Sequence, residues 1–166
     1  IKITNCLISN NTANLYGGGV YLENSLSTFR NSRIFANHAT ISNFQQGGAG
    51  LFAKTSTVLM EMVIVENNIS FGPEGNAGGI YSFESNMDFK NVNIVNNQAD
   101  EYGGGIVLYN GTHTFTDVNI INNILQNNGI FKKLVTNLEK NKYLFFSINE
   151  NMLCFPEEKK ELINFN

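Results

Sequence analysis

Side chains that could share a catalytic site are few in this 166-residue chain, in which charged residues make up 15%. Enzymes that cleave polysaccharides bring two carboxylates together, often beside a basic residue, for general acid–base chemistry or Ca²⁺ binding. When the chain is aligned to itself, Glu61 and Asp117 occupy the same repeat position. The other copies have asparagine there: Asn5, Asn31 and Asn91. If the repeat copies stack on one another as successive coils, these two acids lie two coils, or about 10 Å, apart. They are then either a catalytic pair or solvated turn residues.

The other charged residues do not gather at one repeat position. Asp88, Asp100 and Glu101 are expected in turns. Arg30 and Arg33 fall in a different coil from these acids. We expect ordinary solvated residues, and the alternative is a polysaccharide lyase or hydrolase site assembled from them.

Metal and redox chemistry find little support in the sequence. His38 and His113 occupy different repeat positions, which favours surface histidines over a shared metal site. Cys6 and Cys154 lie at opposite ends of the chain in unlike surroundings, which favours unpaired thiols over a disulfide and does not settle the redox compartment. The glycine clusters lack the Lys-Ser or Lys-Thr of a phosphate loop. We predict no catalytic residue, no metal site and no cofactor.

The glycine clusters belong to a repeat that extends from Ile1 to about residue 123. Each copy has glycines, a short apolar run, a polar turn, an alternating run and an Ile-x-x-Asn motif. Successive motifs are 26, 30, 30 and 26 residues apart, and the extra residues fall at 41–46 and 71–76. The aligned positions are Val20, Leu51, Ile80 and Ile106; Ile3, Phe29, Leu59, Phe89 and Phe115; Ile8, Ile34, Ile64, Ile94 and Ile120; and Asn11, Asn37, Asn67, Asn97 and Asn123.

This repeat predicts an all-β parallel β-helix, or solenoid, of about five coils with three short strands per coil. In the second copy the strands are expected near 19–23, 27–31 and 33–36, since apolar and polar residues alternate there. Equivalent residues would stack about 4.8 Å apart, giving aliphatic and aromatic columns inside and an asparagine ladder at a bend. Propellers have longer repeats, and sandwiches do not repeat column by column.

The repeat ends at about residue 123, which gives two parts: the β-helix at 1–123 and a C-terminal part at 124–166. Residues Phe131, Leu134, Val135 and Leu138 have helical spacing, and Pro156 with two following acids looks like a second helix start. A helical C-terminal cap over the last coil is one interpretation, and a poorly ordered extension is the other. Because Ile1 falls inside a repeat, we expect a fragment of a longer protein.

One column outside the predicted core is the candidate binding face. Strand alternation directs these residues away from the core: Tyr21, Phe52, Tyr81 and Val107. A row of aromatic rings on a flat face could stack on sugars or bind a partner protein. The alternatives are that a loop or the tail covers the column, or that these residues are simply good strand formers.

Charge and motifs limit the partners. The net charge of −3 gives no reason to expect nucleic acid or an anionic membrane as partner. No apolar run approaches the roughly 20 residues of a membrane span. Asn10, Asn68 and Asn110 begin Asn-x-Ser/Thr sequences, which are expected by chance in so asparagine-rich a chain.

The copies YGGGVYL…IFAN, GGAGLFA…IVEN, AGGIYSF…IVNN and YGGGIVL…IINN resemble the repeats of the chlamydial polymorphic membrane proteins. Those repeats pair a GGA[ILV] motif with FxxN, and the resemblance covers roughly residues 1 to 123. Gly47–Gly50 is closest to the first motif, while isoleucine replaces the phenylalanine of the second in every copy.

This resemblance implies a right-handed β-helix of the pectin-lyase-like type. It also implies export to the cell surface, in bacteria the outer membrane, and adhesion without catalysis to proteins or glycans of host or neighbouring cells. A carbohydrate-active enzyme on the same scaffold, a polysaccharide lyase or glycoside hydrolase, is the alternative. A structural spacer that presents other domains is a third hypothesis.

Overall fold

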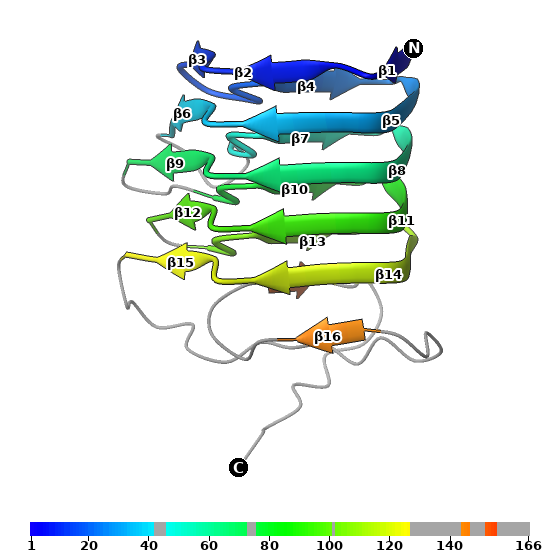
Figure 1. The fold of residues 1–166 in the computed structure, drawn as a ribbon. Helices are drawn as coiled ribbons and strands as arrows, with labels where there is room; N and C mark the ends of the chain where they lie inside the picture. The colour runs from blue at the N-terminus through cyan, green and yellow to red at the C-terminus, as the bar shows by residue number, and fades with distance from the viewer. Residues whose placement is uncertain (42–45, 73–75, 101, 127–143, 147–151, 156–166) are drawn as a thin grey trace.

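The computed structural model describes residues 1–41, 46–72, 76–100, 102–126, 144–146 and 152–155, all of them in strands or their connections (Figure 1). Every strand pairing is parallel, and each strand pairs with the equivalent strand of the next coil. The parallel β-helix predicted from the repeat is therefore confirmed. Among the described residues, no helix is long and apolar enough to cross a membrane.

Three sheets run along the stack. The long-strand sheet consists of β1 (Lys2–Thr4), β2 (Leu7–Ser9), β5 (Leu26–Phe35), β8 (Thr57–Glu66), β11 (Asn86–Val95), β14 (His113–Ile121) and β16 (Leu144–Phe146). The sheet after the glycines consists of β4 (Val20–Glu23), β7 (Leu51–Lys54), β10 (Ile80–Phe83), β13 (Ile106–Tyr109) and β17 (Met152–Phe155). The short-strand sheet consists of β3 (Thr12–Ala13), β6 (His38–Thr40), β9 (Ile69–Phe71), β12 (Gln98–Ala99) and β15 (Ile124–Leu125).

Three strands per coil is correct, but two of the expected boundaries are wrong. The segments expected at 27–31 and 33–36 form one strand, β5, and the third strand is β6. Asn31, in the middle of β5, has a left-handed φ of 44° and no partner in the ladder to β8. The left-handed residue bends the strand without changing its register to β8, because Met62 of β8 has the same conformation. The alternation therefore restarts one residue later, and the sequence pattern resembles two strands.

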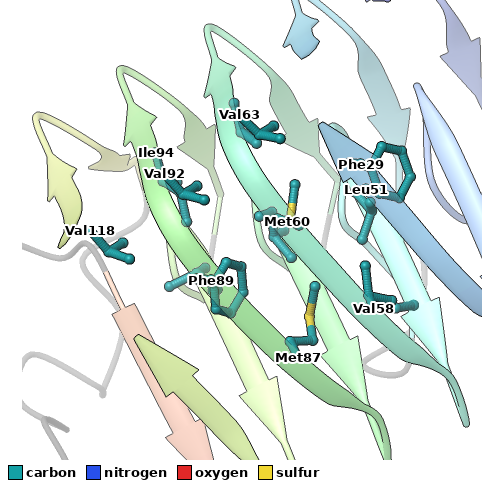
Figure 2. Packing of buried hydrophobic residues seen from close by; sticks show 14 of the residues in the cluster. Phe29, Leu51, Val58, Met60, Val63, Met87, Phe89, Val92, Ile94 and Val118 are labelled. Atoms are coloured by element: carbon teal, nitrogen blue, oxygen red, sulfur yellow. The ribbon is translucent and has the colours of Figure 1, made fainter. Parts of the chain in front are cut away.

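The main core lies between the long-strand sheet and the sheet after the glycines (Figure 2). Its columns include the stack Phe29, Met60, Phe89 and Phe115, all nearly inaccessible to solvent. The rings of Phe89 and Phe115 stack with their centroids 4.9 Å apart. A single coil could not bury these side chains, and stacking the coils removes them from water.

The third coil is displaced by one residue from the sequence alignment. Met60, Val65 and Asn68, instead of Leu59, Ile64 and Asn67, stand beside the core and ladder residues of the second coil. The equivalent positions Ile8, Ile34, Val65, Ile94 and Ile120 are thus 26, 31, 29 and 26 residues apart. Both registers satisfy the pattern, because 57–66 is almost continuously apolar and two asparagines follow it. The strand pairing decides between them, since a slip of one residue exchanges the faces of a strand.

Left-handed backbone recurs at fixed corners of every coil and explains the richness in asparagine. Nine of the fifteen described non-glycine residues with positive φ are asparagines, which tolerate this conformation better than most residues. One such corner contains Asn5, Asn31, Met62, Asn91 and Asp117. Another contains Gly17, Gly48, Ala77 and Gly103, so left-handed backbone falls two residues before the last glycine of each cluster, where glycine adopts it without strain.

After Asn123 the strands continue although the repeat motif fades. β15 completes the fifth coil, and β16 and β17 then add parallel strands to β14 and β13. The helices predicted around residues 131–138 and after Pro156 lie outside the described residues. Among the residues of the C-terminal part that the structure describes, secondary structure is strand only.

Candidate functional site

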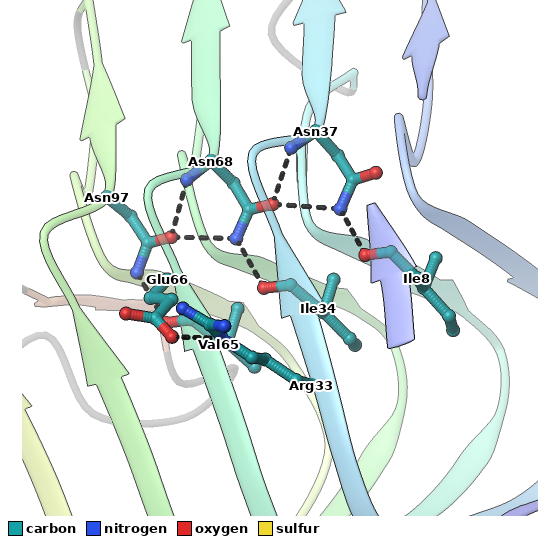
Figure 3. Close-up of polar contacts among 8 residues, drawn as sticks. All are labelled: Ile8, Arg33, Ile34, Asn37, Val65, Glu66, Asn68 and Asn97. Carbon is teal, nitrogen blue, oxygen red and sulfur yellow. Dashed lines mark hydrogen bonds and ion pairs between the residues drawn. The ribbon is translucent and has the colours of Figure 1, made fainter. Parts of the chain in front are cut away.

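The most regular polar feature of the described residues is an asparagine ladder of Asn11, Asn37, Asn68, Asn97 and Asn123. Figure 3 shows its central members, Asn37, Asn68 and Asn97. The Asn68 amide nitrogen donates to Asn97 Oδ1 at 2.9 Å and to the Ile34 carbonyl at 3.1 Å. Its Oδ1 accepts from the backbone N–H of Asn37 at 2.9 Å and from Asn37 Nδ2 at 3.0 Å. The side chain is fully buried and uses its two donors and two acceptor sites. The predicted ladder exists, with Asn68 in place of Asn67.

The last glycine of a cluster packs directly on this ladder, as Gly19, Gly50 and Gly79 show. A Cβ added to Gly50 would lie 3.0 Å from Asn68 Nδ2 and 2.6 Å from the Gly79 carbonyl oxygen. A Cβ on Gly79 would lie 3.1 Å from Asn97 Nδ2 and 2.3 Å from the Gly105 carbonyl oxygen. These contacts are tighter than a methyl group tolerates, so the two halves of the repeat motif form one structural unit. The glycines provide room for the ladder.

The candidate binding face is mostly buried, so the column is covered, as one of the alternatives expected, at every position but Tyr21. Relative exposure is 44% for Tyr21 but 1%, 0% and 1% for Phe52, Tyr81 and Val107. The column does point away from the main core, as alternation requires, but it forms a second apolar cluster with Ala77 and Phe83. Partly buried tyrosines pack against that cluster: Tyr16, Tyr102 and Tyr109.

Tyrosines next to the glycine clusters contribute to this burial, which alternation alone cannot predict. The ring of Tyr16 lies 4.9 Å from that of Phe52, and Phe52 meets Tyr81 edge-on at 5.2 Å. Desolvation raises the pKa of the Tyr81 hydroxyl well above its usual value. A role in partner binding is left to Tyr21 alone among the four residues.

Tyr21 belongs to a small polar network on the surface. Its hydroxyl donates to Glu23 Oε2 at 2.7 Å, and Lys54 Nζ donates to Glu23 Oε1 at 2.7 Å. Partial burial, followed by the hydrogen bond to Glu23, raises the pKa of Tyr21. The hydrogen bond from Lys54 lowers the pKa of Glu23. Each of these polar side chains thus has a partner within the scaffold.

Glu61 and Asp117 are not equivalent, because the third coil is displaced. Glu61 stands in register with Arg30 and Lys90, and its Oε2 lies 2.9 Å from Arg30 Nε. Asp117 instead occupies a left-handed corner, where Met62 takes the place predicted for Glu61. The carboxylate pair that motivated the enzyme hypothesis is therefore not assembled as the alignment placed it.

The remaining charged candidates are engaged with neighbours. Asp88 accepts from Lys90 at 2.7 Å and from the Thr114 hydroxyl at 2.5 Å. Partial burial raises its pKa, but these two hydrogen bonds outweigh that effect and the net pKa is lowered. Arg33 pairs with Glu66, and its guanidinium lies 4.4 Å from the centroid of the Phe35 ring.

Of the acids expected in turns, Asp100 accepts a hydrogen bond from the Gly72 N–H at 2.7 Å. Glu101 lies outside the described residues. Cys6 is an exposed free thiol, and the Cys154 side chain is not among those described. Within the described ranges, no group of three or more His, Cys, Asp or Glu residues could hold a metal ion.

The two histidines differ in position, and the surface expectation is wrong for His113. It stands in register with Met87 in an inward column that also contains Ser27 and Val58. Desolvation lowers the pKa of His113 to about 4, although a hydrogen bond with the Asn110 backbone opposes the shift. The alternation of outward Thr114 with inward His113 and Phe115 was the sequence signal for this burial. His38 is partly buried, with its ring 6.5 Å from that of Phe71.

Comparisons with protein-family models, with curated proteins and with solved structures found no match to this chain. No related protein therefore adds to what the structure shows about the fold and the repeat positions.

Proposed function

We propose that this chain is part of a cell-surface or secreted β-helix protein with a structural or adhesive role and no catalysis. Polar side chains that repeat from coil to coil serve the scaffold. The ladder asparagines bond to one another, corner asparagines supply left-handed backbone, and the glycines make room for the ladder. This use of the repeated positions for stacking carries the proposal.

The resemblance of the GGA-like and Ile-x-x-Asn motifs to chlamydial polymorphic membrane proteins supports surface localisation, in bacteria at the outer membrane. A pectin-lyase-like β-helix with a right-handed turn is the architecture that this resemblance favours. Its partners would be proteins or glycans of host or neighbouring cells. A structural spacer uses the same scaffold without a partner.

A binding surface, if the role is adhesive, is best placed where the coils differ from one another. The outward columns of the long-strand sheet do so, and we call them the outer face: Arg30, Glu61, Lys90 and Thr116, with Arg33, Ile64, Asn93 and Asn119. Arg33, Ile64 and Lys90 are exposed. A flat surface with charged, amide and aliphatic groups can form both hydrogen bonds and apolar contacts with a protein or glycan.

Binding of the purified chain to cultured cells, matrix proteins and a glycan array tests the adhesive role. Arg30→Ser, Ile64→Ser and Lys90→Ser combined should abolish binding, because they remove a cation, an apolar contact and a second cation from the outer face. The matched control changes Phe71→Ser and Ile124→Ser, which are exposed on the short-strand sheet. Equal loss of binding in both variants, with unchanged melting, would exclude the outer face.

The enzyme alternative is tested on the same preparation with uronate polymers and neutral glycans. No release of unsaturated or reducing sugar ends is expected. Activity that disappears in Glu61→Gln or Asp117→Asn would contradict the non-catalytic role. Activity unaffected by either change would also contradict it and would place the site elsewhere.

A further inference from the structure

The three Asn-x-Ser/Thr sequences, beginning at Asn10, Asn68 and Asn110, fall at three different positions of the coil. This sequence is the acceptor for N-linked glycans in secreted proteins. The repeat itself does not require a hydroxyl residue two positions after an asparagine. Whether each sequence can accept a glycan in the folded chain depends on the surroundings of its amide nitrogen.

Asn68 cannot carry a glycan in this fold. Glycosylation replaces one amide hydrogen with a sugar, and both hydrogens of Asn68 Nδ2 already donate, to Asn97 Oδ1 and to the Ile34 carbonyl. The side chain is fully buried, and a Cβ on Gly50 would already lie 3.0 Å from Nδ2. A space too small for a methyl group cannot admit a sugar ring. A glycan here would separate the coils.

Asn10 lies at a corner where side chains point into solvent. It has a φ of 57° and is exposed, and its amide nitrogen has a single long contact of 3.4 Å with Ser9 Oγ. The equivalent residues of later coils, Asn67, Asn96 and Asn122, are exposed as well. The residue of the second coil, Ala36, is partly exposed. Exposure at this corner is thus not confined to the end of the stack.

Asn110 lies in the turn after β13, with a φ of 53°. Asn110 itself is partly exposed, and its equivalents at this turn, Asn24, Thr55 and Glu84, are exposed, so the coil presents the position outward. Thr112, the hydroxyl residue of the sequence, is exposed too. A sugar added at this turn would extend away from the stacked sheets.

We propose that Asn10 and Asn110 are N-glycan acceptor sites of the folded chain and that glycosylation of Asn68 is incompatible with the fold. These assignments rest on the secretion included in the proposed function. In the reaction the amide nitrogen bonds to C1 of an oligosaccharide carried on a lipid diphosphate. The bond from C1 to the diphosphate oxygen breaks, the amide loses one proton, and the lipid diphosphate leaves. The producing cell supplies this glycosyl donor and the transferase.

Secretion of the chain from a eukaryotic cell line with N-glycosylation tests the assignments. The folded monomer is isolated by gel filtration, and enzymatic deglycosylation in heavy-oxygen water marks each formerly glycosylated asparagine as labelled aspartate. Label is expected at positions 10 and 110 and not at 68. Labelled position 68 in the folded monomer, or unlabelled 10 and 110, would overturn the corresponding assignment.

Ser70→Ala provides a matched variant, because it removes the acceptor sequence at Asn68 without touching the ladder. Ser70 is buried in register with Ala39 and Ala99, so alanine fits the column. If some chains receive a glycan at Asn68 before folding, this variant raises the yield of folded secreted monomer. Glycosylated Asn68 confined to aggregated or retained material supports the incompatibility.

The outcome is separable from the adhesive role. Label at 10 and 110 in a chain that binds no cell or glycan would leave the acceptor sites standing and remove the adhesive function. Binding through the outer face by a chain without label would support the adhesive function and remove the acceptor sites.

Discussion

Replacing Asn68 with alanine removes the central part of the buried ladder. The change leaves the Asn37 N–H, one hydrogen of Asn37 Nδ2 and the Ile34 carbonyl without their partner. A buried polar group without a partner costs about 1–3 kcal/mol, so three such groups predict a loss of about 4 kcal/mol if some water enters the space. That is a large part of the roughly 5–15 kcal/mol by which a domain of this size is stable.

Urea unfolding followed by circular dichroism measures the free energy of unfolding of Asn68→Ala and of a control, Asn67→Gly. Asn67 is exposed with a φ of 54°, a conformation that glycine adopts freely, so the control should change stability by less than about 1 kcal/mol. The two residues also distinguish the two possible registers of the third coil. A loss below about 1 kcal/mol for Asn68→Ala, or a larger loss for Asn67→Gly, would refute the ladder as described.

Three further substitutions test other parts of the structure. Gly79→Ala should lower the free energy of unfolding by about 2 kcal/mol or more, since its Cβ would lie 2.3 Å from a carbonyl oxygen; an unchanged urea midpoint would contradict the close packing. Met62→Asn should raise the melting temperature, by an amount equivalent to about 0.5–1 kcal/mol, because φ is 53° at this exposed corner; a lower melting temperature would argue against the register. His113 has a pKa of about 4 in the folded chain and about 6.5 in the unfolded chain, so only the unfolded chain binds a proton between these values. The free energy of unfolding should therefore fall as the pH is lowered from 7, by about 2–3 kcal/mol at pH 4.5. His113→Met, which copies Met87 in the same column, should lack that part of the loss in paired urea titrations, and identical pH dependence would refute the burial.

The sequence was sufficient for the architecture because glycines and asparagines mark each coil in the same way. The columns of Ile34, Ile94 and Ile120 follow from the spacing to the next asparagine alone. The third coil could not be placed from the same pattern. Its strand is apolar on both faces, and Asn67 and Asn68 both satisfy the motif. Only the pairing with neighbouring coils, which stacks Asn68 between two other asparagines, selects the register.

The candidate surface shows a different limit. Alternation correctly directed Phe52, Tyr81 and Val107 away from the main core, but it gave no information about a second layer. That layer includes tyrosines next to the glycine clusters, such as Tyr16, whose position depends on the left-handed turn that follows. Burial therefore depends on the path of the chain outside the strand. Sequence periodicity does not describe that path.

In-register stacking is tested most directly by a distance between spin labels at opposite ends of one outer column. Thr4 and Thr116 are exposed and are four strand pairings apart, at about 4.8 Å each, which gives roughly 19 Å. Thr4→Cys and Thr116→Cys are introduced into a chain with Cys6→Ser and Cys154→Ser, and pulsed dipolar spectroscopy measures the separation. A narrow distribution near 20 Å is expected. A mean beyond about 30 Å, or a broad featureless distribution, would contradict the stacked coils on which the whole account depends.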